Sequence, residues 1–543
     1  MQNNGNWYSI FINNVKRKIA KIPGLLWCYV SFRDLIGLTS KYDSGFRHLK
    51  NWLSELNHAG NEENDLFGKK FLFYSDLPYW VNYSLALSVL IIGRGASIDF
   101  AWQSNTGYRS RDIEGLEYTA WGHLVKKLQR KSLHRHLNLV NLSNVVPAIV
   151  TDEMRKIAAH QALMDTSYVL LKESVDIDNN PFDKAEYEFR YMRNLDALRR
   201  LSTVCNGNKY DRLILPSGAI LEFGAIFSFV KNLELPTSTY EFSNNHTLII
   251  SNGASVMGMD ASDLWVKDSP HVLTDERRQR VQQIIENRQR PAPKEVTLNF
   301  FQLADVVSSE EIKNQLGIES NKPIILMCPN CPFDAAYYVE GKKLFLTMVK
   351  WLVENIQFLI ERNDCHVIVR CHPAERFYQA KESTESIIRE TFLELPDHIQ
   401  IIKPDDPIST YSIMNIADIG LVYWSTTGLE MAMRGIPVVS GVPSIHYNCK
   451  GFTLDPQTLD EYFQMIDKVI KDPSANRLTK RQIELSWCYA DIFFNDWPKP
   501  FPWALGERFW FDIKEWPISR MLSDEGKKTY GNTLSILTGE CYR

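Results

Sequence analysis

Three consecutive hydroxyl side chains lie at the centre of the stretch YWSTTGLEMAMRGIPVV. Ser425, Thr426 and Thr427 stand between an expected strand, 419–424, and an expected helix, 429–434. A turn that opens a helix carries unpaired backbone N–H groups and the positive end of the helix dipole, and both favour an anion. The pattern therefore predicts a binding site for a phosphate group.

Glu430 lies in the first turn of the same expected helix. A carboxylate at this position is suited to accept hydrogen bonds from the diol of a ribose. A second interpretation is open, because STTGLE also has the composition of a capping box, in which a Ser or Thr caps the helix and Glu430 bonds back to it. The two interpretations are compatible, since a capped helix end also binds anions.

Another polar element, VIVRCHPAE, follows a second buried strand directly. His372 is placed at the carboxyl edge of the sheet, where it can contact a phosphate, and Pro373 is suited to the first position of a helix. Arg370 or Arg376 is a candidate to assist this contact. The alternative is structural, because a single histidine at a strand end usually has no ligand.

Alternating strand and helix patterns surround these elements in two blocks, which predicts parallel sheets covered by helices. In the first block the expected strands are 70–75, 96–102, 212–215 and 237–242, with helices after the first and third. In the second block the expected strands are 322–328, 366–370, 399–403, 419–424 and 436–440, and the helices are 341–362, 374–395, 408–416 and 429–434. We therefore expect an α/β protein with two Rossmann-like domains facing a cleft.

The charged stretch 274–290 ends in RPAPKE, whose prolines predict a stiff connector between the domains. A tail rich in aromatic residues begins at Trp487; it is either a strap that packs back on the protein or a stacking platform for sugars. The expected ranges are an N-terminal helical extension (1–65), an acceptor-side domain (66–300), a donor nucleotide-binding domain (301–486) and the C-terminal strap (487–543).

A family resemblance rests on RCHPAE, on PDDPISTYSIMNIADIGLVYWSTTGLEMAMRGIPVV and on HYNCKGFTLDP. These stretches resemble bacterial capsule polysaccharide biosynthesis proteins and related Kdo-type transferases of lipopolysaccharide synthesis, which are glycosyltransferases of the two-Rossmann (GT-B) architecture. The resemblance covers about a quarter of the chain, 322–456. It implies that His372, Ser425 and Thr426 contact the donor phosphate, often of a CMP-linked acidic sugar, and that Glu430 matches the family's acidic residue.

A transferase of this kind that inverts the anomeric centre needs a base on the acceptor side. Glu241, at the end of an expected strand and close to His246 in sequence, ranks first. Glu222, in the first turn of a helix, ranks second, although it can simply complement the helix dipole; Asp76 ranks third. On the donor side, Asn330 and Asp334 either line the cleft or cap the next element.

No metal ion or other cofactor is expected, because neither Asp260 and Asp263 nor the turn at Asp405–Asp406 has the spacing of a metal-binding DxD pair. The CxxC pair Cys328 and Cys331 has no partner pair at zinc spacing. A formal net charge of −4 disfavours nucleic acid as a partner. Instead, the expected partners are a nucleotide sugar and a glycan or lipid-linked glycan acceptor.

The segment 11–32 mixes basic and apolar residues at helical spacing. It is either a membrane-surface helix or, as the sequence favours, a helix packed on the protein body. Cysteine usage fits a reducing compartment, so we expect a cytoplasmic enzyme, with peripheral membrane contact as an alternative. Two other functions stay open: a sugar-nucleotide epimerase of the same build, and a non-catalytic glycan assembly protein.

Overall fold

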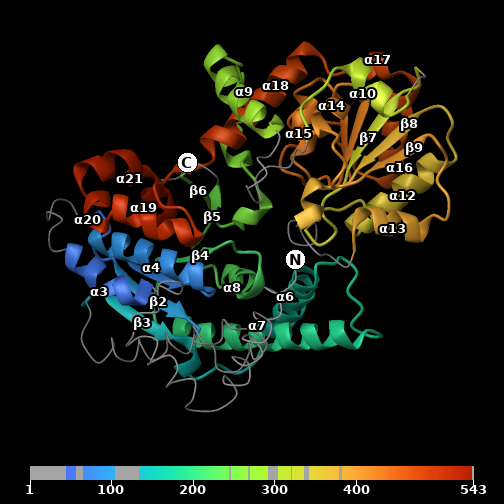
Figure 1. The fold of residues 1–543 in the computed structure, drawn as a ribbon. Helices are drawn as coiled ribbons and strands as arrows, with labels where there is room; N and C mark the ends of the chain where they lie inside the picture. Colours follow the sequence, from blue (N-terminus) through green and yellow to red (C-terminus); the bar gives the residue numbers. More distant parts are fainter. Residues whose placement is uncertain are drawn as a thin grey trace, which may run out of the picture. The chain divides into compact units, whose positions relative to one another are not determined.

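The structure is a computed structural model that describes residues 45–56, 65–103, 134–243, 246–266, 269–290, 304–318, 321–334, 341–377 and 382–540. The chain forms two compact units (Figure 1). The first unit comprises Met1–Ala162, Ala185–Val256 and Lys499–Arg543, and the second comprises Leu163–Lys184 and Met257–Pro498. These units divide the chain differently from the expected ranges, because 257–290 and 487–498 belong to the second unit.

The described residues of the first unit contain one seven-stranded sheet in the order β12-β6-β5-β4-β1-β2-β3. Its strands are β1 (Lys70–Tyr74), β2 (Ser97–Trp102), β3 (Leu137–Asn141), β4 (Arg212–Pro216), β5 (Thr237–Ser243), β6 (Thr247–Asn252) and β12 (Lys499–Pro500). β1 to β5 are parallel, whereas β6 runs antiparallel to both of its neighbours. The order of the parallel strands reverses between β1 and β4, and we call such a position the switch point of its sheet.

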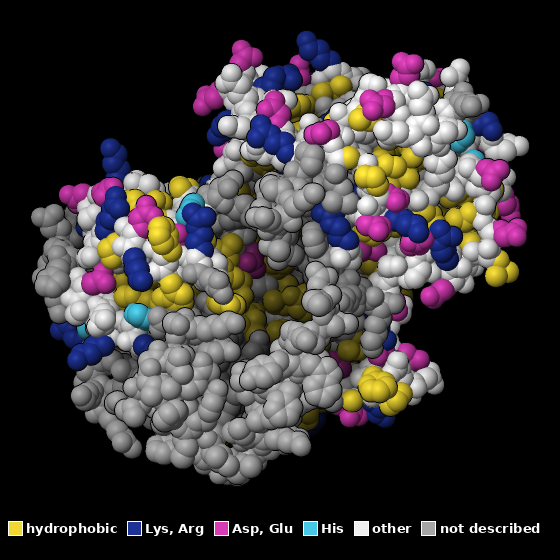
Figure 2. All heavy atoms as spheres, viewed as in Figure 1, with side chains coloured by type: hydrophobic (Ala, Val, Ile, Leu, Met, Phe, Trp, Pro, Cys, Tyr) yellow, Lys and Arg dark blue, Asp and Glu magenta, His cyan; other side chains and the backbone are white. Residues whose placement is uncertain are grey.

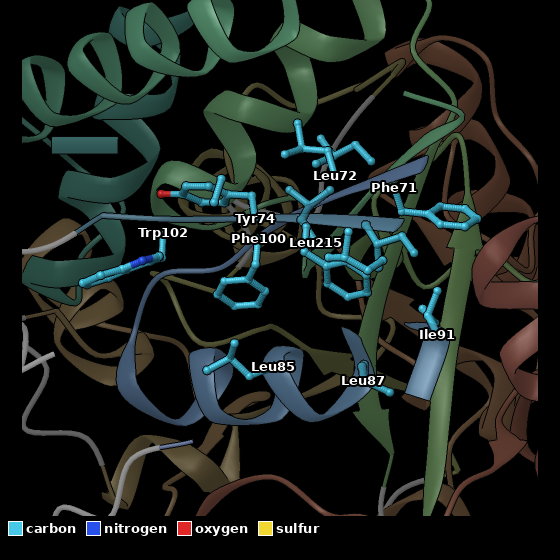
Figure 3. Packing of buried hydrophobic residues seen from close by; sticks show 14 of the residues in the cluster. Phe71, Leu72, Tyr74, Leu85, Leu87, Ile91, Phe100, Trp102 and Leu215 are labelled. Carbon is cyan, nitrogen blue, oxygen red and sulfur yellow. The ribbon is translucent and has the colours of Figure 1, made fainter. Parts of the chain in front are cut away.

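Apolar side chains hold helices against both faces of this sheet. Figure 3 shows Phe100 of β2 directed toward Leu85 of α4, whereas Leu72 of β1 points to the opposite face. The helices of this unit are α3 (Gly45–Glu55), α4 (Pro78–Gly93), α8 (Leu221–Asn232), α19 (Phe509–Glu515), α20 (Ile518–Met521) and α21 (Asp524–Thr538); α6 (Asp152–Leu170) and α7 (Pro181–Asn206) contribute to both units. The tail residues Phe501 and Trp503 are fully buried in this core, so their rings are closed to sugars.

Among its described residues the second unit has one parallel five-stranded sheet in the order β11-β10-β7-β8-β9. Its strands are β7 (Ile324–Cys328), β8 (His366–Arg370), β9 (Ile399–Ile402), β10 (Ile419–Val422) and β11 (Val438–Ser440). The switch point of this sheet lies between β7 and β10. Its helices are α9 (Asp275–Gln289), α10 (Ser309–Gln315), α12 (Met348–Ile360), α13 (Thr384–Thr391), α14 (Thr410–Met414), α15 (Thr427–Ala432), α16 (Leu459–Lys471), α17 (Pro473–Asn476) and α18 (Lys480–Asp491).

The prediction of an α/β protein with two Rossmann-like sheets is confirmed, because both parallel sets have the strand order 3-2-1-4-5. The prediction of a single helix over 374–395 is wrong. A short 3₁₀ helix covers Pro373–Phe377, and α13 begins only after Ser383, whose side chain and that of Ser386 form a capping box. A strong N-cap within the expected helix therefore starts a separate helix.

Two of the expected segments, 11–32 and most of the RPAPKE connector, lie outside the described residues. Within the described ranges, no helix is both long and apolar enough to cross a membrane. Figure 2 shows basic and acidic side chains interspersed on the visible face. That mixture accords with the small net charge of the sequence.

Candidate functional site

The switch point of the second sheet is held together by Asn330, which lies two residues after β7. Its Oδ1 accepts the Trp424 N–H at 2.9 Å, and its Nδ2 donates to the Trp424 carbonyl. Trp424 immediately precedes the three hydroxyl residues that follow β10. In open parallel sheets, ligands bind beyond the strand ends at this position. Asn330 therefore shapes the ligand-binding edge through the backbone of its neighbouring loop.

The loop after β10 presents hydrogen-bond donors that have no partner. The Ser425 Oγ accepts the Thr427 N–H at 3.3 Å and donates to the Thr427 Oγ1 at 3.0 Å. By contrast, the N–H groups of Ser425 and Thr426 and the Thr426 hydroxyl make no hydrogen bond within the described ranges. Successive free N–H groups form a concave anion site. Because α15 has six residues, these donors contribute more to anion binding than its dipole does.

Tyr447, from the HYNCKG stretch, holds this loop through a hydrogen bond to its backbone. Its hydroxyl donates to the Ser425 carbonyl at 2.7 Å, and its side chain is fully buried. Gly428 allows this approach, because a Cβ there would lie 2.2 Å from the Tyr447 Oη. The sequence alone indicates no role for Tyr447, because a buried tyrosine has no local signal of the loop that it contacts.

His372 follows β8 and is half-buried. Its Nδ1 accepts the Ala374 N–H at 3.2 Å, which places the proton of the neutral ring on Nε2. Burial, assisted by the charge of Arg370, lowers the pKa of His372 to about 4. At neutral pH the ring is thus an uncharged N–H donor. Strands lie about 4.8 Å apart, so the ends of β8 and β10 are separated by about 10 Å.

Two nitrogens of Arg370, which is expected to assist a phosphate contact, are used within the protein, whereas its buried Nη2 has no hydrogen-bond partner among the described residues. Its Nε donates to the Thr410 Oγ1 at 3.3 Å, and its Nη1 donates to the Lys403 carbonyl. The side chain is 2% exposed. Arg370 therefore fastens the loop after β9 to α14. Pro373, the other neighbour of His372 that was expected at the site, begins the short 3₁₀ helix after β8.

Glu430 is the fourth residue of α15 and is 4% exposed. Its Oε1 lies 3.0 Å from the Nη2 of Arg288, in the last turn of α9. The capping-box interpretation is wrong, because the Thr426 side chain makes no capping bond and Glu430 pairs with Arg288. Sequence reasoning missed Arg288, since a charged residue on a polar helix carries no local signal of a distant ion pair.

Two further polar positions follow β7. The Asp334 N–H donates to the Cys331 carbonyl at 2.9 Å, and burial raises the pKa of the half-buried Asp334 carboxyl to about 6. Burial also raises the pKa of Cys328 to about 12 and that of Cys331 further, so both thiols stay protonated at neutral pH. In the described part of the chain, no three His, Cys, Asp or Glu side chains are placed to hold a metal ion.

The switch point of the first sheet is occupied by an ion network. Arg193 of α7 donates from Nη2 to Asp76, which follows β1, at 2.7 Å, and from Nε to Glu222, which follows β4. All three side chains are buried, with exposures of 2–3%. Two of the candidate bases are therefore held by the same guanidinium.

Glu241 has a different environment. It lies on β5 opposite Ile249, beyond the last residue that β5 pairs with β4. Its Oε1 accepts the Phe242 N–H at 3.1 Å, and it has no ion pair among the described residues. Burial raises the pKa of this half-buried carboxyl to about 7. Glu241 can therefore take up a proton near neutral pH.

His246, expected near Glu241, instead joins β6 to the C-terminal segment. Its Nδ1 donates to the Pro502 carbonyl at 2.8 Å, and its Nε2 accepts from the Arg508 Nη2 at 2.7 Å. Both ring nitrogens are thus used within the first unit. This pairing across more than 250 residues has no signal in the local sequence.

No protein-family model matches the chain, and no curated protein matches it either. Solved structures with similarity to it include sucrose-phosphate synthase from Thermosynechococcus elongatus, at 11% identity and a TM-score of 0.27 over 79% of this chain and 98% of that one. UDP-GlcNAc 2-epimerase from Neisseria meningitidis, bound to UDP-GlcNAc, has 9% identity and a TM-score of 0.25 over 78% and 97%. The calicheamicin glycosyltransferase CalG4 has 11% identity and a TM-score of 0.20 over 87% and 98%. Likenesses at this level identify neither a family nor a substrate.

Proposed function

We propose that this chain is a glycosyltransferase that takes a sugar from a nucleotide-activated donor and passes it to a surface polysaccharide or a lipid-linked glycan. The observation that carries this proposal is the set of unpaired donors at the loop Ser425–Thr427, at the switch point of the second sheet. We call these donors the phosphate cradle. A CMP-linked acidic sugar such as Kdo is the donor that the sequence resemblance favours.

The chemistry follows from these donors in outline. The acceptor oxygen attacks the anomeric carbon, and the bond from that carbon to the phosphate oxygen breaks. The nucleotide leaves with the electron pair, and its growing negative charge is stabilised by the cradle and by the neutral Nε2–H of His372. Because fixed N–H donors can do this electrostatic work, we propose that the reaction needs no metal ion. Full activity in the presence of a chelator is the expected result.

For the base we propose Glu241, which removes the proton of the acceptor hydroxyl in an inverting transfer. Its pKa of about 7 suits this task. Since a base must be deprotonated, activity should rise with pH through about 7, and Glu241→Gln should abolish this rise together with most of the activity. A pH profile of kcat/KM for Glu222→Gln is the control, and an unchanged profile in Glu241→Gln would reject the assignment.

The first test is a thermal-shift screen with CMP, UDP, GDP and their sugars. A ligand at about 100 times its Kd adds about 2.7 kcal/mol to the free energy of unfolding. We expect one nucleotide series to raise the melting temperature clearly. If none does at millimolar concentration, the proposed function fails.

Calorimetry with the nucleotide so identified then tests the site. We expect His372→Ala and Glu430→Ala each to weaken donor binding by about tenfold or more, as loss of a hydrogen bond to a charged group does. Unchanged affinity in both variants would place the donor elsewhere.

Incubation with the donor alone separates the alternative functions. An epimerised sugar would indicate an epimerase, and slow hydrolysis of the donor would exclude a non-catalytic protein.

A further inference from the structure

The carboxylate of Glu430 lies one helical turn from the phosphate cradle. The Glu430 N–H donates to the Thr426 carbonyl at 3.3 Å, so the two residues are stacked on one side of α15. Residues four apart on a helix lie about 6 Å from each other. A buried carboxylate at this distance repels a bound phosphate. The cradle therefore needs a compensating positive charge if it is to bind a nucleotide.

Arg288 is placed to supply that charge. Its guanidinium is 3.0 Å from the Glu430 carboxylate and lies 5.4 Å from the centre of the Phe494 ring. The side chain is 38% exposed, whereas that of Glu430 is 4% exposed. Arg288 is thus the member of the pair that reaches solvent, and an incoming ligand meets it before the carboxylate.

The ion pair between Arg288 and Glu430 leaves hydrogen-bonding capacity on the carboxylate. Although Arg288 is within ion-pair distance, the Oε1 of Glu430 makes no aligned hydrogen bond with any described residue. A carboxylate that is buried in this state retains open acceptor positions. The cost of separating the two groups is lower than for a bidentate pair, provided that Glu430 gains hydrogen bonds from a ligand.

Two other guanidinium groups of this edge make contacts within the protein, although the buried Nη2 of Arg370 has no hydrogen-bond partner among the described residues. Arg370 donates to Thr410 and to the Lys403 carbonyl, on the side of α14. Arg434 donates to the Asn415 Oδ1 at 2.9 Å and lies over the Tyr411 ring. Among the described residues, Arg288 is therefore the guanidinium that lies within ion-pair distance of the Glu430 carboxylate, and it is partly exposed.

The helix that carries Arg288 is itself anchored. α9 is bound to α18 by Arg280, whose Nη2 lies 2.6 Å from the fully buried Asp491, and by Arg277, whose Nε lies 3.3 Å from the same carboxylate. This anchor fixes the backbone at some distance from the last turn. The long Arg288 side chain can consequently change partners while the helix stays in place.

We infer that Arg288 exchanges Glu430 for the donor phosphate when a nucleotide binds, which frees Glu430 to accept the ribose hydroxyls. This inference rests on the proposed function and adds a phosphate-contacting residue from outside the Rossmann sheet. It implies that Arg288 contributes to affinity only for ligands that carry a phosphate. A residue that merely supported the fold would affect nucleotides and nucleosides alike. Because an unpaired Glu430 would itself repel phosphate, contact of Arg288 with the phosphate is distinguished from neutralisation of Glu430 by comparing Glu430→Gln with Arg288→Met/Glu430→Gln.

The test compares the nucleotide identified in the thermal screen with its nucleoside. We expect Arg288→Met to weaken binding of the nucleotide by about tenfold or more and to leave the nucleoside within about twofold. Arg288→Lys, which keeps the charge, should restore most of the nucleotide affinity. Arg278→Met removes one positive charge elsewhere on α9 and should leave both affinities unchanged. Arg280→Met removes an ion pair between α9 and α18, so it shows how far nucleotide affinity depends on the position of α9.

Each outcome decides the inference. Equal losses for nucleotide and nucleoside in Arg288→Met, or no loss for either, would overturn it. If Arg288→Met does not fold because Glu430 is left unpaired, the double variant Arg288→Met/Glu430→Gln removes the buried charge. Its nucleotide affinity should then fall below that of Glu430→Gln alone, whereas equal affinities would reject the inference. A wild-type protein that binds no nucleotide would instead reject the proposed function itself.

Discussion

The two switch points have the same topology and opposite chemistry. In the first unit, Asp76 and Glu222 both accept hydrogen bonds from Arg193 in a buried network. In the second unit a neutral amide, Asn330, joins the strand ends, and within the described ranges the donors of the next loop have no partners. The comparison suggests that a Rossmann edge offers a ligand site where its polar groups lack internal partners. Where these groups satisfy one another, the edge is structural.

The largest effect should come from the first switch point. Arg193→Met leaves the carboxylates of Asp76 and Glu222 buried without a cation, and breaking such a network costs about 3–5 kcal/mol. We expect the variant to lose that much of the free energy of unfolding in urea. The double change Asp76→Asn/Glu222→Gln, combined with Arg193→Met, should recover part of it. A single variant as stable as wild type would mean that the network carries little energy.

The second unit should be most sensitive at Gly428. In Gly428→Ala the new Cβ would lie 2.2 Å from the Tyr447 Oη, so the bond from Tyr447 to Ser425 must break. Such overpacking costs about 3 kcal/mol and should also abolish nucleotide binding. Gly531→Ala is the matched control: it lies within α21 with no atom within 4 Å of the new Cβ, and should gain about 0.5–1 kcal/mol. Equal melting temperatures for the two variants would refute the role of Gly428.

A smaller effect is expected at Asn330. Asn330→Asp keeps the acceptor for the Trp424 N–H but sets a carboxylate oxygen against the Trp424 carbonyl. The variant should lose about 1–2 kcal/mol and bind nucleotide more weakly, because the cradle follows Trp424 directly. Because this cost falls on the ionised acid, it raises the pKa of the new carboxyl in the folded state above its ordinary value of about 4. The stability difference from wild type should therefore narrow as pH falls toward about 4, where the protonated acid can donate again. A difference that stays constant down to pH 3 would contradict this account.

Much of this arrangement follows from the sequence, because apolar runs and their spacing locate most of the parallel strands of both sheets. The hydroxyl loop after β10 and His372 after β8 were also predicted at a sheet edge from local pattern alone. The contacts that decide their chemistry were not, since Arg288, Tyr447 and Arg193 act across 22 to 142 residues of chain. The sequence reasoning had no means to pair a charge with a partner so distant. For the same reason, the contacts of Arg370 with Thr410 and with the Lys403 carbonyl were not predicted.

The smallest expected effects distinguish the two switch points most clearly, because one hydroxyl can be removed at each of them. Thr426→Val removes a hydroxyl that has no partner in the described structure, so stability should stay within about 0.5 kcal/mol of wild type. Nucleotide affinity should nevertheless fall by about two- to tenfold, the usual worth of one hydrogen bond. At the first switch point, the Oγ of Ser217 accepts the Ala219 N–H at 3.4 Å. Ser217→Ala should therefore reduce stability by up to about 1 kcal/mol and leave nucleotide affinity unchanged. A donor without a partner should contribute to ligand binding, whereas a group that already has a partner should contribute to the stability of the fold. If both variants instead changed only stability, or only nucleotide affinity, the two switch points would not differ in this way.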